Sequence, residues 1–135
     1  MTISVTLAYP PSTNRLTRMA NGIAYKPSEV KAWCKEAAWR LQAAGAKPLV
    51  GDVAVAVALH PKATKKGVAY ARRIDLDNAI KAALDACQGV VFDNDRQVVR
   101  LHAVVSFPLN KGGLTVMAWE LNDPAPNLEP YWETA

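Results

Sequence analysis

Two aspartates, Asp75 and Asp77, are the residues in this 135-residue chain whose type and spacing most suggest chemistry. They stand where a basic loop gives way to the pattern of a helix, and Lys81 follows four residues after the second one. A third acidic position, Asp95, comes in the turn Asp93-Asn94-Asp95. Carboxylate oxygens are the ligands that hard cations such as Mg²⁺ and Mn²⁺ prefer, and a Mg²⁺ site commonly combines one or two carboxylates with water and substrate phosphates. The three aspartates therefore suit one or two such ions facing a phosphodiester.

The same residues also fit a purely structural interpretation. Aspartate is favoured at the start of a helix, so Asp75 and Asp77 could cap one. Lys81 could pair with Asp77 across one helical turn, and Asp93-Asn94-Asp95 could be a polar turn. Spacing alone does not separate the two interpretations, because Asp-x-Asp is a common pattern.

Composition places the chain among folded proteins with a single domain, since half of its residues are hydrophobic and 21% are charged. No apolar run reaches the roughly 18 residues of a membrane span. The first seven residues alternate as a strand does and do not resemble a signal peptide, so we expect a cytoplasmic location. Cys34 and Cys87 stand apart among apolar residues, which indicates reduced core cysteines and not a zinc site.

The net charge of +4 conceals an asymmetry along the chain. All 16 lysines and arginines lie within residues 1–119, whereas the stretch from Glu120 onward carries acidic residues and no basic one. A basic body around a small acidic focus suits a substrate with a phosphate backbone. Composition alone fits a merely basic protein equally well.

Apolar periodicity, punctuated by glycine and proline, predicts the order β-α-β-α-β-β. This order favours an α+β fold, with a small mixed sheet of about four strands and both helices packed on one face. In the second strand, large side chains alternate with alanine, so one face could accept a closely packed layer. His60 at its end is expected to be structural or solvent-facing. We expect a domain over residues 1–121 and an irregular acidic tail over 122–135, with residues 110–113 forming a hairpin turn between the last two strands. The expected elements cover residues 2–8, 28–44, 52–60, 77–88, 97–107 and 114–121.

Two loops carry basic residues that could contact a phosphate backbone. Residues 61–73 contain no acid and lead straight into Asp75, although such a run can also be simply solvated. The loop after the first strand could be a plain connection or a second arm. The basic residues concerned are Lys62, Lys65, Lys66, Arg72 and Arg73 in the first of these loops, and Arg15 and Arg18 in the second.

Four short motifs, taken in this order, resemble the RusA family of Holliday junction resolvases, small endonucleases of phages and prophages. The resemblance extends over about residues 3 to 121, and its second motif is the most specific. The motifs are Pro10-Pro11-Ser12-Thr13-Asn14, then Asp75-Leu76-Asp77-Asn78 followed by Lys81, then Gly89-Val90-Val91-Phe92 leading to Asp95-Arg96-Gln97-Val98, and finally Lys111-Gly112-Gly113.

The resemblance implies a homodimeric nuclease that depends on Mg²⁺, with Mn²⁺ as an alternative. Its substrate would be four-way or other branched DNA, resolved by paired symmetric nicks during recombination and repair. Asp75, Asp77 and Asp95 would be both metal ligands and catalytic residues. Lys81 would be the catalytic lysine, and the basic residues of the two loops would hold the DNA backbone.

The chain departs from the family's pattern at two positions. Asn94 stands where the family usually has the first of two adjacent aspartates, and Ile74 stands where a basic residue often precedes Asp-x-Asp. Three rival functions stay open: a flap or fork endonuclease, a catalytically inactive protein that binds branched DNA, and a Mg²⁺-dependent phosphohydrolase for small nucleotides. Cleavage assays on junctions, flaps, forks and free nucleotides separate them.

Overall fold

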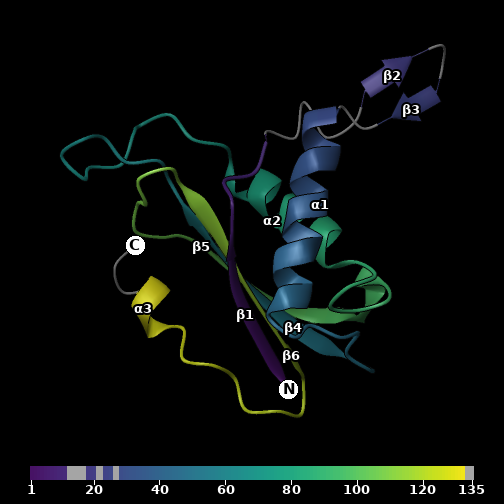
Figure 1. Cartoon of the computed structure of the whole chain (residues 1–135). Helices are drawn as coiled ribbons and strands as arrows, with labels where there is room; N and C mark the ends of the chain where they lie inside the picture. Colours follow the sequence, from purple (N-terminus) through teal and green to yellow (C-terminus); the bar gives the residue numbers. More distant parts are fainter. Residues whose placement is uncertain (12–17, 21–22, 26–27, 133–135) are drawn as a thin grey trace.

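A computed structural model describes residues 1–11, 18–20, 23–25 and 28–132, with side chains for 1–11 and 28–132 (Figure 1). Its main body is a four-stranded sheet in the order β1-β6-β4-β5, and a separate short pair, β2-β3, lies outside it. The six predicted helices and strands are confirmed, and the α+β fold with them. The strands are β1 (Thr2–Leu7), β2 (Arg18–Ala20), β3 (Ile23–Tyr25), β4 (Val53–His60), β5 (Val98–Val105) and β6 (Gly113–Glu120). The helices are α1 (Ser28–Ala43), α2 (Leu76–Cys87), the 3₁₀ helix η2 (Asp95–Gln97) and α3 (Glu129–Trp132).

The pairing of the last two strands differs from the prediction. β5 pairs in parallel with β4, whereas β6 is antiparallel to both β4 and β1, so β5 and β6 are not neighbours and the predicted hairpin is wrong. Every residue of β4 is buried, and the buried backbone N–H and C=O groups of such a strand need hydrogen-bond partners along both of its edges. The loop after β5 continues alongside the chain that follows β4, with Leu109 N–H donating to Pro61 O at 3.0 Å, before β6 begins. It therefore takes the chain past the end of β4 to the strand's free edge.

Both main helices lie on one face of the sheet, as predicted (Figure 1). On that face the large side chains of β4, including Val55 and Val57, pack in one core with Trp33 and Leu41 of α1. α2 turns a row of small residues toward the same core, which lets its backbone approach the sheet closely. Its fully buried positions are mostly alanines rather than the larger Ile80 and Leu84 that periodicity suggested.

The alanine face of β4 is covered by the segment that follows β6. Ala54 and Ala56 form a second core with Met117 and Trp119, and the partly buried side chains of Leu121, Leu128, Tyr131 and Trp132 pack against it. The short helix α3 belongs to this segment and lies on the opposite side of the sheet from α1 (Figure 1). The division of the chain into a domain and a tail stays a prediction.

His60 is a structural residue of the second face. Its Nδ1 lies 2.9 Å from Phe107 O and its Nε2 lies 2.7 Å from Thr115 Oγ1, while its ring also contacts Tyr131. Burial lowers the pKa of His60, and the hydrogen bond to Phe107 O opposes this shift. The neutral imidazole therefore ties the loop after β5 to β4 and β6.

Along the described part of the chain, no helix is long and apolar enough to cross a membrane. Both cysteines are free thiols, and burial raises the pKa of the Cys87 thiol to about 12. Cys87 therefore stays protonated at neutral pH and serves as a small core residue.

Candidate active site

Asp75 occupies the N-cap position of α2 but does not use its side chain as a cap. The backbone there is extended, with φ −68° and ψ 151°, and Asp75 O accepts the hydrogen bond of Ala79 N–H at 3.1 Å. The carboxylate of Asp75 accepts no capping hydrogen bond. The capping interpretation is therefore wrong for this side chain, which stays exposed beside the positive end of the helix.

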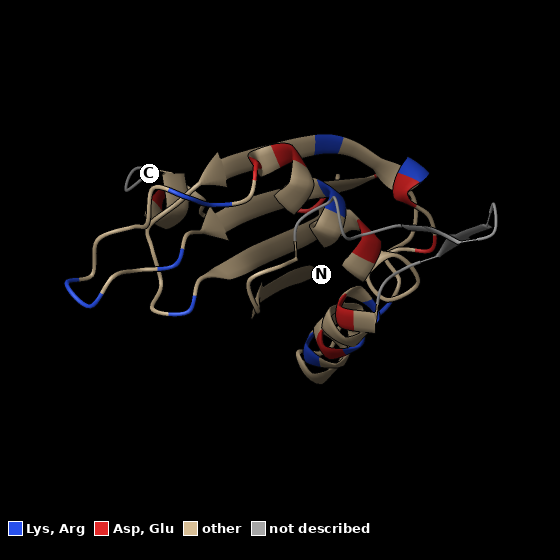
Figure 2. Ribbon diagram, turned by 90° about the horizontal axis from the view of Figure 1, so that it is seen from above, with Lys and Arg blue, Asp and Glu red and all other residues tan. Residues whose placement is uncertain are grey.

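The basic loop that leads into Asp75 is folded back on itself. Tyr70 N–H donates to Lys62 O at 3.0 Å and Thr64 N–H donates to Val68 O at 2.7 Å, so Lys65 and Lys66 lie in the turn of a small hairpin. Figure 2 shows the blue turn of this loop projecting beyond the ends of the strands, and a second blue segment leading back toward α2. The hydrogen bonds hold a row of cations on a defined path toward α2.

The end of this loop and the start of α2 enclose a cavity of about 570 Å³, which we call the aspartate cavity. Three predicted DNA-binding cations line this cavity together with one predicted metal-binding carboxylate. Its lining residues are Tyr9, Lys62, Tyr70, Arg72, Arg73, Ile74, Asp75 and Asn78. Positive charge around one free carboxylate suits a phosphate held together with a cation.

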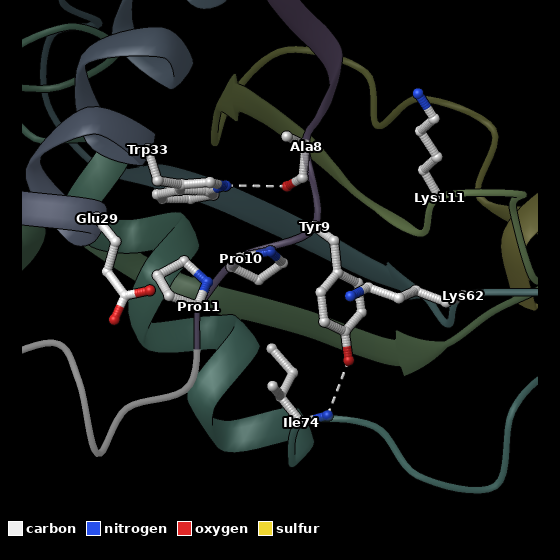
Figure 3. A pocket seen from close by; sticks show the side chains of 9 residues that line it. All are labelled: Ala8, Tyr9, Pro10, Pro11, Glu29, Trp33, Lys62, Ile74 and Lys111. Carbon is white, nitrogen blue, oxygen red and sulfur yellow. Dashed lines mark hydrogen bonds between the residues drawn. The ribbon is translucent and has the colours of Figure 1, made fainter.

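Tyr9 holds the backbone that carries Asp75. Its hydroxyl accepts a hydrogen bond from Ile74 N–H at 2.9 Å, and Lys62 Nζ lies 5.1 Å from the centre of its ring (Figure 3). Gly112 makes room for that ring, because a Cβ at this position would lie 2.6 Å from Tyr9 Cδ1. The strand end, the basic loop and the loop before β6 therefore meet at one tyrosine.

Asp95 begins the 3₁₀ helix η2 in a turn that is tied to the rest of the fold by its neighbours. Asn94 Oδ1 accepts from Arg96 N–H at 2.9 Å, so this departure from the family's pattern serves as a cap. Gln97 Oε1 accepts from Asp93 N–H, while Gln97 Nε2 donates to Leu49 O and Gly51 O, all at 2.9 Å. The exposed Asp95 carboxylate takes part in none of these hydrogen bonds.

The predicted metal ligands and the lysine are all exposed and have no partner among the residues whose side chains the structure describes. Within residues 1–11 and 28–132, the side chains of Asp75, Asp77, Asp95 and Lys81 form no hydrogen bond or ion pair, so the alternative Asp77–Lys81 pair is not formed. Hard oxygen donors without protein partners have the right chemistry for Mg²⁺. The described residues nevertheless contain no group of three or more acidic, histidine or cysteine side chains close enough to hold a metal together. The carboxylates thus fit as individual donors, and their assembly into one metal site stays a prediction.

The remaining predicted DNA contacts lie elsewhere. Lys65 and Lys66 are exposed in the loop but do not line the aspartate cavity. Arg15 lies outside the described residues, and for Arg18 only the backbone, in β2, is described.

Sequence reasoning gave no role to Tyr9, Tyr70 or Lys111. Tyr9 stands directly before the first resemblance motif and Lys111 opens the fourth, so proximity to those motifs was the available signal. Tyr70 lies in the basic loop between Lys66 and Arg72, and a tyrosine between cations was a second signal. The structure leaves 53% of its surface exposed.

Fold and site together define an α+β protein that presents exposed carboxylates beside a cationic cavity suited to a phosphate chain. The family model for the endodeoxyribonuclease RusA matches residues 8–118. The chain belongs to the RusA family.

The chain is also similar to known crossover junction endodeoxyribonucleases over most of their length. A crossover junction endodeoxyribonuclease RusA from Escherichia coli O139:H28 is 33% identical over 123 residues, which cover 90% of this chain and 98% of the relative. The proteins of that name from Escherichia coli K12 and Shigella sonnei are 34% and 33% identical over 112 residues, covering 83% of this chain and 88% of each relative.

Proposed function

We propose that this protein is a metal-dependent endonuclease that cuts branched DNA, above all four-way junctions. One observation carries the proposal: the carboxylate of Asp75, which has no partner among the described residues, shares a cavity with Lys62, Arg72 and Arg73. The crossover junction nucleases to which the chain is similar support the same substrate class.

Asp75, Asp77 and Asp95 would hold one or two Mg²⁺ ions, or Mn²⁺ in their place. When bound, such an ion neutralises charge on the scissile phosphate and lowers the pKa of a water molecule. Lys81 is one turn along α2 from Asp77, and its ammonium is exposed and unpaired within the described region. It would contact the phosphate as a point charge whose effect is strongest as negative charge develops in the transition state.

The basic loop would position the DNA. Arg72 and Arg73 at its base line the aspartate cavity, and Lys65 and Lys66 at its turn extend the row of cations away from the cavity along the same chain segment. Contacts of this kind set the orientation of a nucleic acid without reading its sequence. They also make affinity depend steeply on salt.

Resolution of a junction requires cuts in two opposed strands, and one chain offers one set of three aspartates. We therefore propose a two-fold homodimer, whose symmetry matches that of an open junction. A stable interface would bury roughly 1,000 Å² or more in total. The edge strand β5 exposes Val99 and Leu101, which are 54% and 43% accessible, and so offers apolar surface for such a contact.

The test is incubation with a labelled four-way junction, with and without Mg²⁺, beside duplex, flap, fork and free-nucleotide controls. We expect Mg²⁺-dependent paired nicks in opposed strands, loss of cleavage in Asp75→Asn, and a species of twice the 14.6 kDa chain mass in light scattering. Asp52→Asn is the matched control, because this exposed aspartate does not line the cavity.

Each rival function has its own outcome in this assay. Faster cleavage of flaps or forks than of junctions would establish the flap or fork endonuclease instead. Binding without cleavage at any metal concentration would leave a branched-DNA-binding protein. Hydrolysis of free nucleotides alone would identify a phosphohydrolase.

A further inference from the structure

A second cavity of about 580 Å³ adjoins the aspartate cavity and has no role in the proposed chemistry. We call it the proline cavity, because Pro10 and Pro11 form part of its wall (Figure 3). The two cavities share Tyr9, Lys62 and Ile74, and Ile74 directly precedes Asp75. The backbone that carries Asp75 therefore borders both cavities.

The walls of the proline cavity are fixed by hydrogen bonds. Trp33 Nε1 donates to Ala8 O at 3.0 Å, and the Tyr9 hydroxyl accepts from Ile74 N–H at 2.9 Å (Figure 3). Gly112 has a φ of +71°, and its missing side chain lets the Tyr9 ring lie against the loop before β6. A cavity with aromatic and proline walls that are held in place is preformed for a flat, partly apolar group.

Charge gives this cavity a direction. Lys62 and Lys111 lie at the end beside Tyr9, whereas Glu29 lies at the other end beside Pro11 (Figure 3). A phosphate is attracted to the lysine end. The attached base would then point toward the proline wall between Tyr9 and Trp33.

We propose that the proline cavity binds one unstacked nucleotide of the strand being cut, next to the scissile phosphate. This inference rests on the proposed function. The volume of the proline cavity falls in the range of small-ligand sites, and a DNA duplex is too wide to enter the cavity. Unstacking a base is least unfavourable where pairing is already disturbed, as at a branch point. Contact with an aromatic ring favours any base, so stacking in the cavity does not require a particular base.

The experiment combines a change in the protein with a change in the DNA. Ala8 lines the proline cavity, so Ala8→Phe should fill it, whereas Ala44→Phe places the same side chain at an exposed position outside both cavities. Binding is measured without divalent metal, on an unmodified junction and on junctions with an abasic site on either side of the mapped cut. We expect Ala8→Phe to bind the unmodified junction about tenfold more weakly, and to match the wild-type protein within about twofold on one abasic junction.

A second pair of variants guards against misfolding of Ala8→Phe, which circular dichroism would reveal. Lys111 is exposed, so Lys111→Ala should fold, bind the junction several-fold more weakly and lower the log–log salt slope by up to about one unit. Lys111→Arg should restore both, and Lys47→Ala, outside both cavities, should change neither.

If folded Ala8→Phe loses the same affinity on every junction, or if Lys111→Ala binds as tightly as the wild-type protein, the nucleotide site is wrong. Either result would leave the proposed function standing. A wild-type protein that binds no branched DNA would overturn the proposed function and this inference together. A wild-type protein that binds and cuts junctions, with the losses confined to unmodified DNA, supports both.

Discussion

Replacing Gly112 by alanine should destabilise the fold and disturb the candidate active site together. Gly112 has a φ of +71°, and a Cβ there would lie 2.6 Å from Tyr9 Cδ1 and 3.1 Å from both His60 O and Lys62 Cγ. A left-handed backbone costs an alanine about 1–2 kcal/mol, and overpacking costs a further ~1–3 kcal/mol. We therefore expect Gly112→Ala to lower the free energy of unfolding by roughly 2–5 kcal/mol.

Gly45→Ala is the matched control, because Gly45 has a φ of +91° but no atom within 4 Å of an added Cβ. It should show only the backbone term of about 1–2 kcal/mol. Urea unfolding followed by tryptophan fluorescence measures both variants, and we expect them to differ by about 1–3 kcal/mol. Equal losses would show that the Tyr9 ring does not rest against residue 112, and would refute the reasoning.

The same substitution should also reduce cleavage, because a displaced Tyr9 no longer accepts the hydrogen bond of Ile74 N–H beside Asp75. Tyr9→Phe keeps the ring and removes only this acceptor, so it should cost about 1 kcal/mol of stability and slow junction cleavage. Folded Gly112→Ala protein that cuts junctions at the wild-type rate would break the proposed link from Gly112 through Tyr9 to Asp75.

Three further predictions concern the carboxylates, the basic loop and the second face of the sheet. Junction cleavage in Mg²⁺ should be abolished in each of the variants Asp75→Asn, Asp77→Asn and Asp95→Asn. Because each substitution removes a negative charge, binding measured by gel shift should be kept or tightened. Cleavage at the wild-type rate would make these aspartates structural. Neutralising all five cations of residues 61–73 should weaken junction binding and lower its log–log salt slope by up to about one unit per lost phosphate contact, and an unchanged slope would remove the loop from the interface. Because burial lowers the pKa of His60, its contribution to stability is complete above the unfolded value near 6.5 and is lost as the pH falls through the folded value. Urea unfolding at pH 7.5 and 5.5 should therefore show that acidification lowers the stability of the wild-type protein more than that of His60→Gln. An equal loss in both proteins would show that His60 is not the source of the pH dependence.

Much of the candidate site could be anticipated because it lies close together in the chain. The basic residues of 61–73, Asp75 and the start of α2 are consecutive, so hydrogen bonding in the loop and the helix start bring them to one cavity. Asn94 illustrates the opposite case. The sequence showed only that it departs from the family's pattern, whereas the structure shows its side chain capping η2 through Arg96 N–H.

The sequence by itself determined the kinds and order of the main helices and strands, because apolar periodicity, glycine and proline act over a few residues. Only the tertiary structure decided which strands are neighbours. β4 is apolar on both faces, and its burial requires β6 at one edge and β5 at the other, a condition that no local turn signal records. Only the tertiary structure, likewise, brought together Tyr9, Lys62 and Lys111, which belong to three distant segments of the chain and meet where the ends of β1 and β4 approach the start of β6.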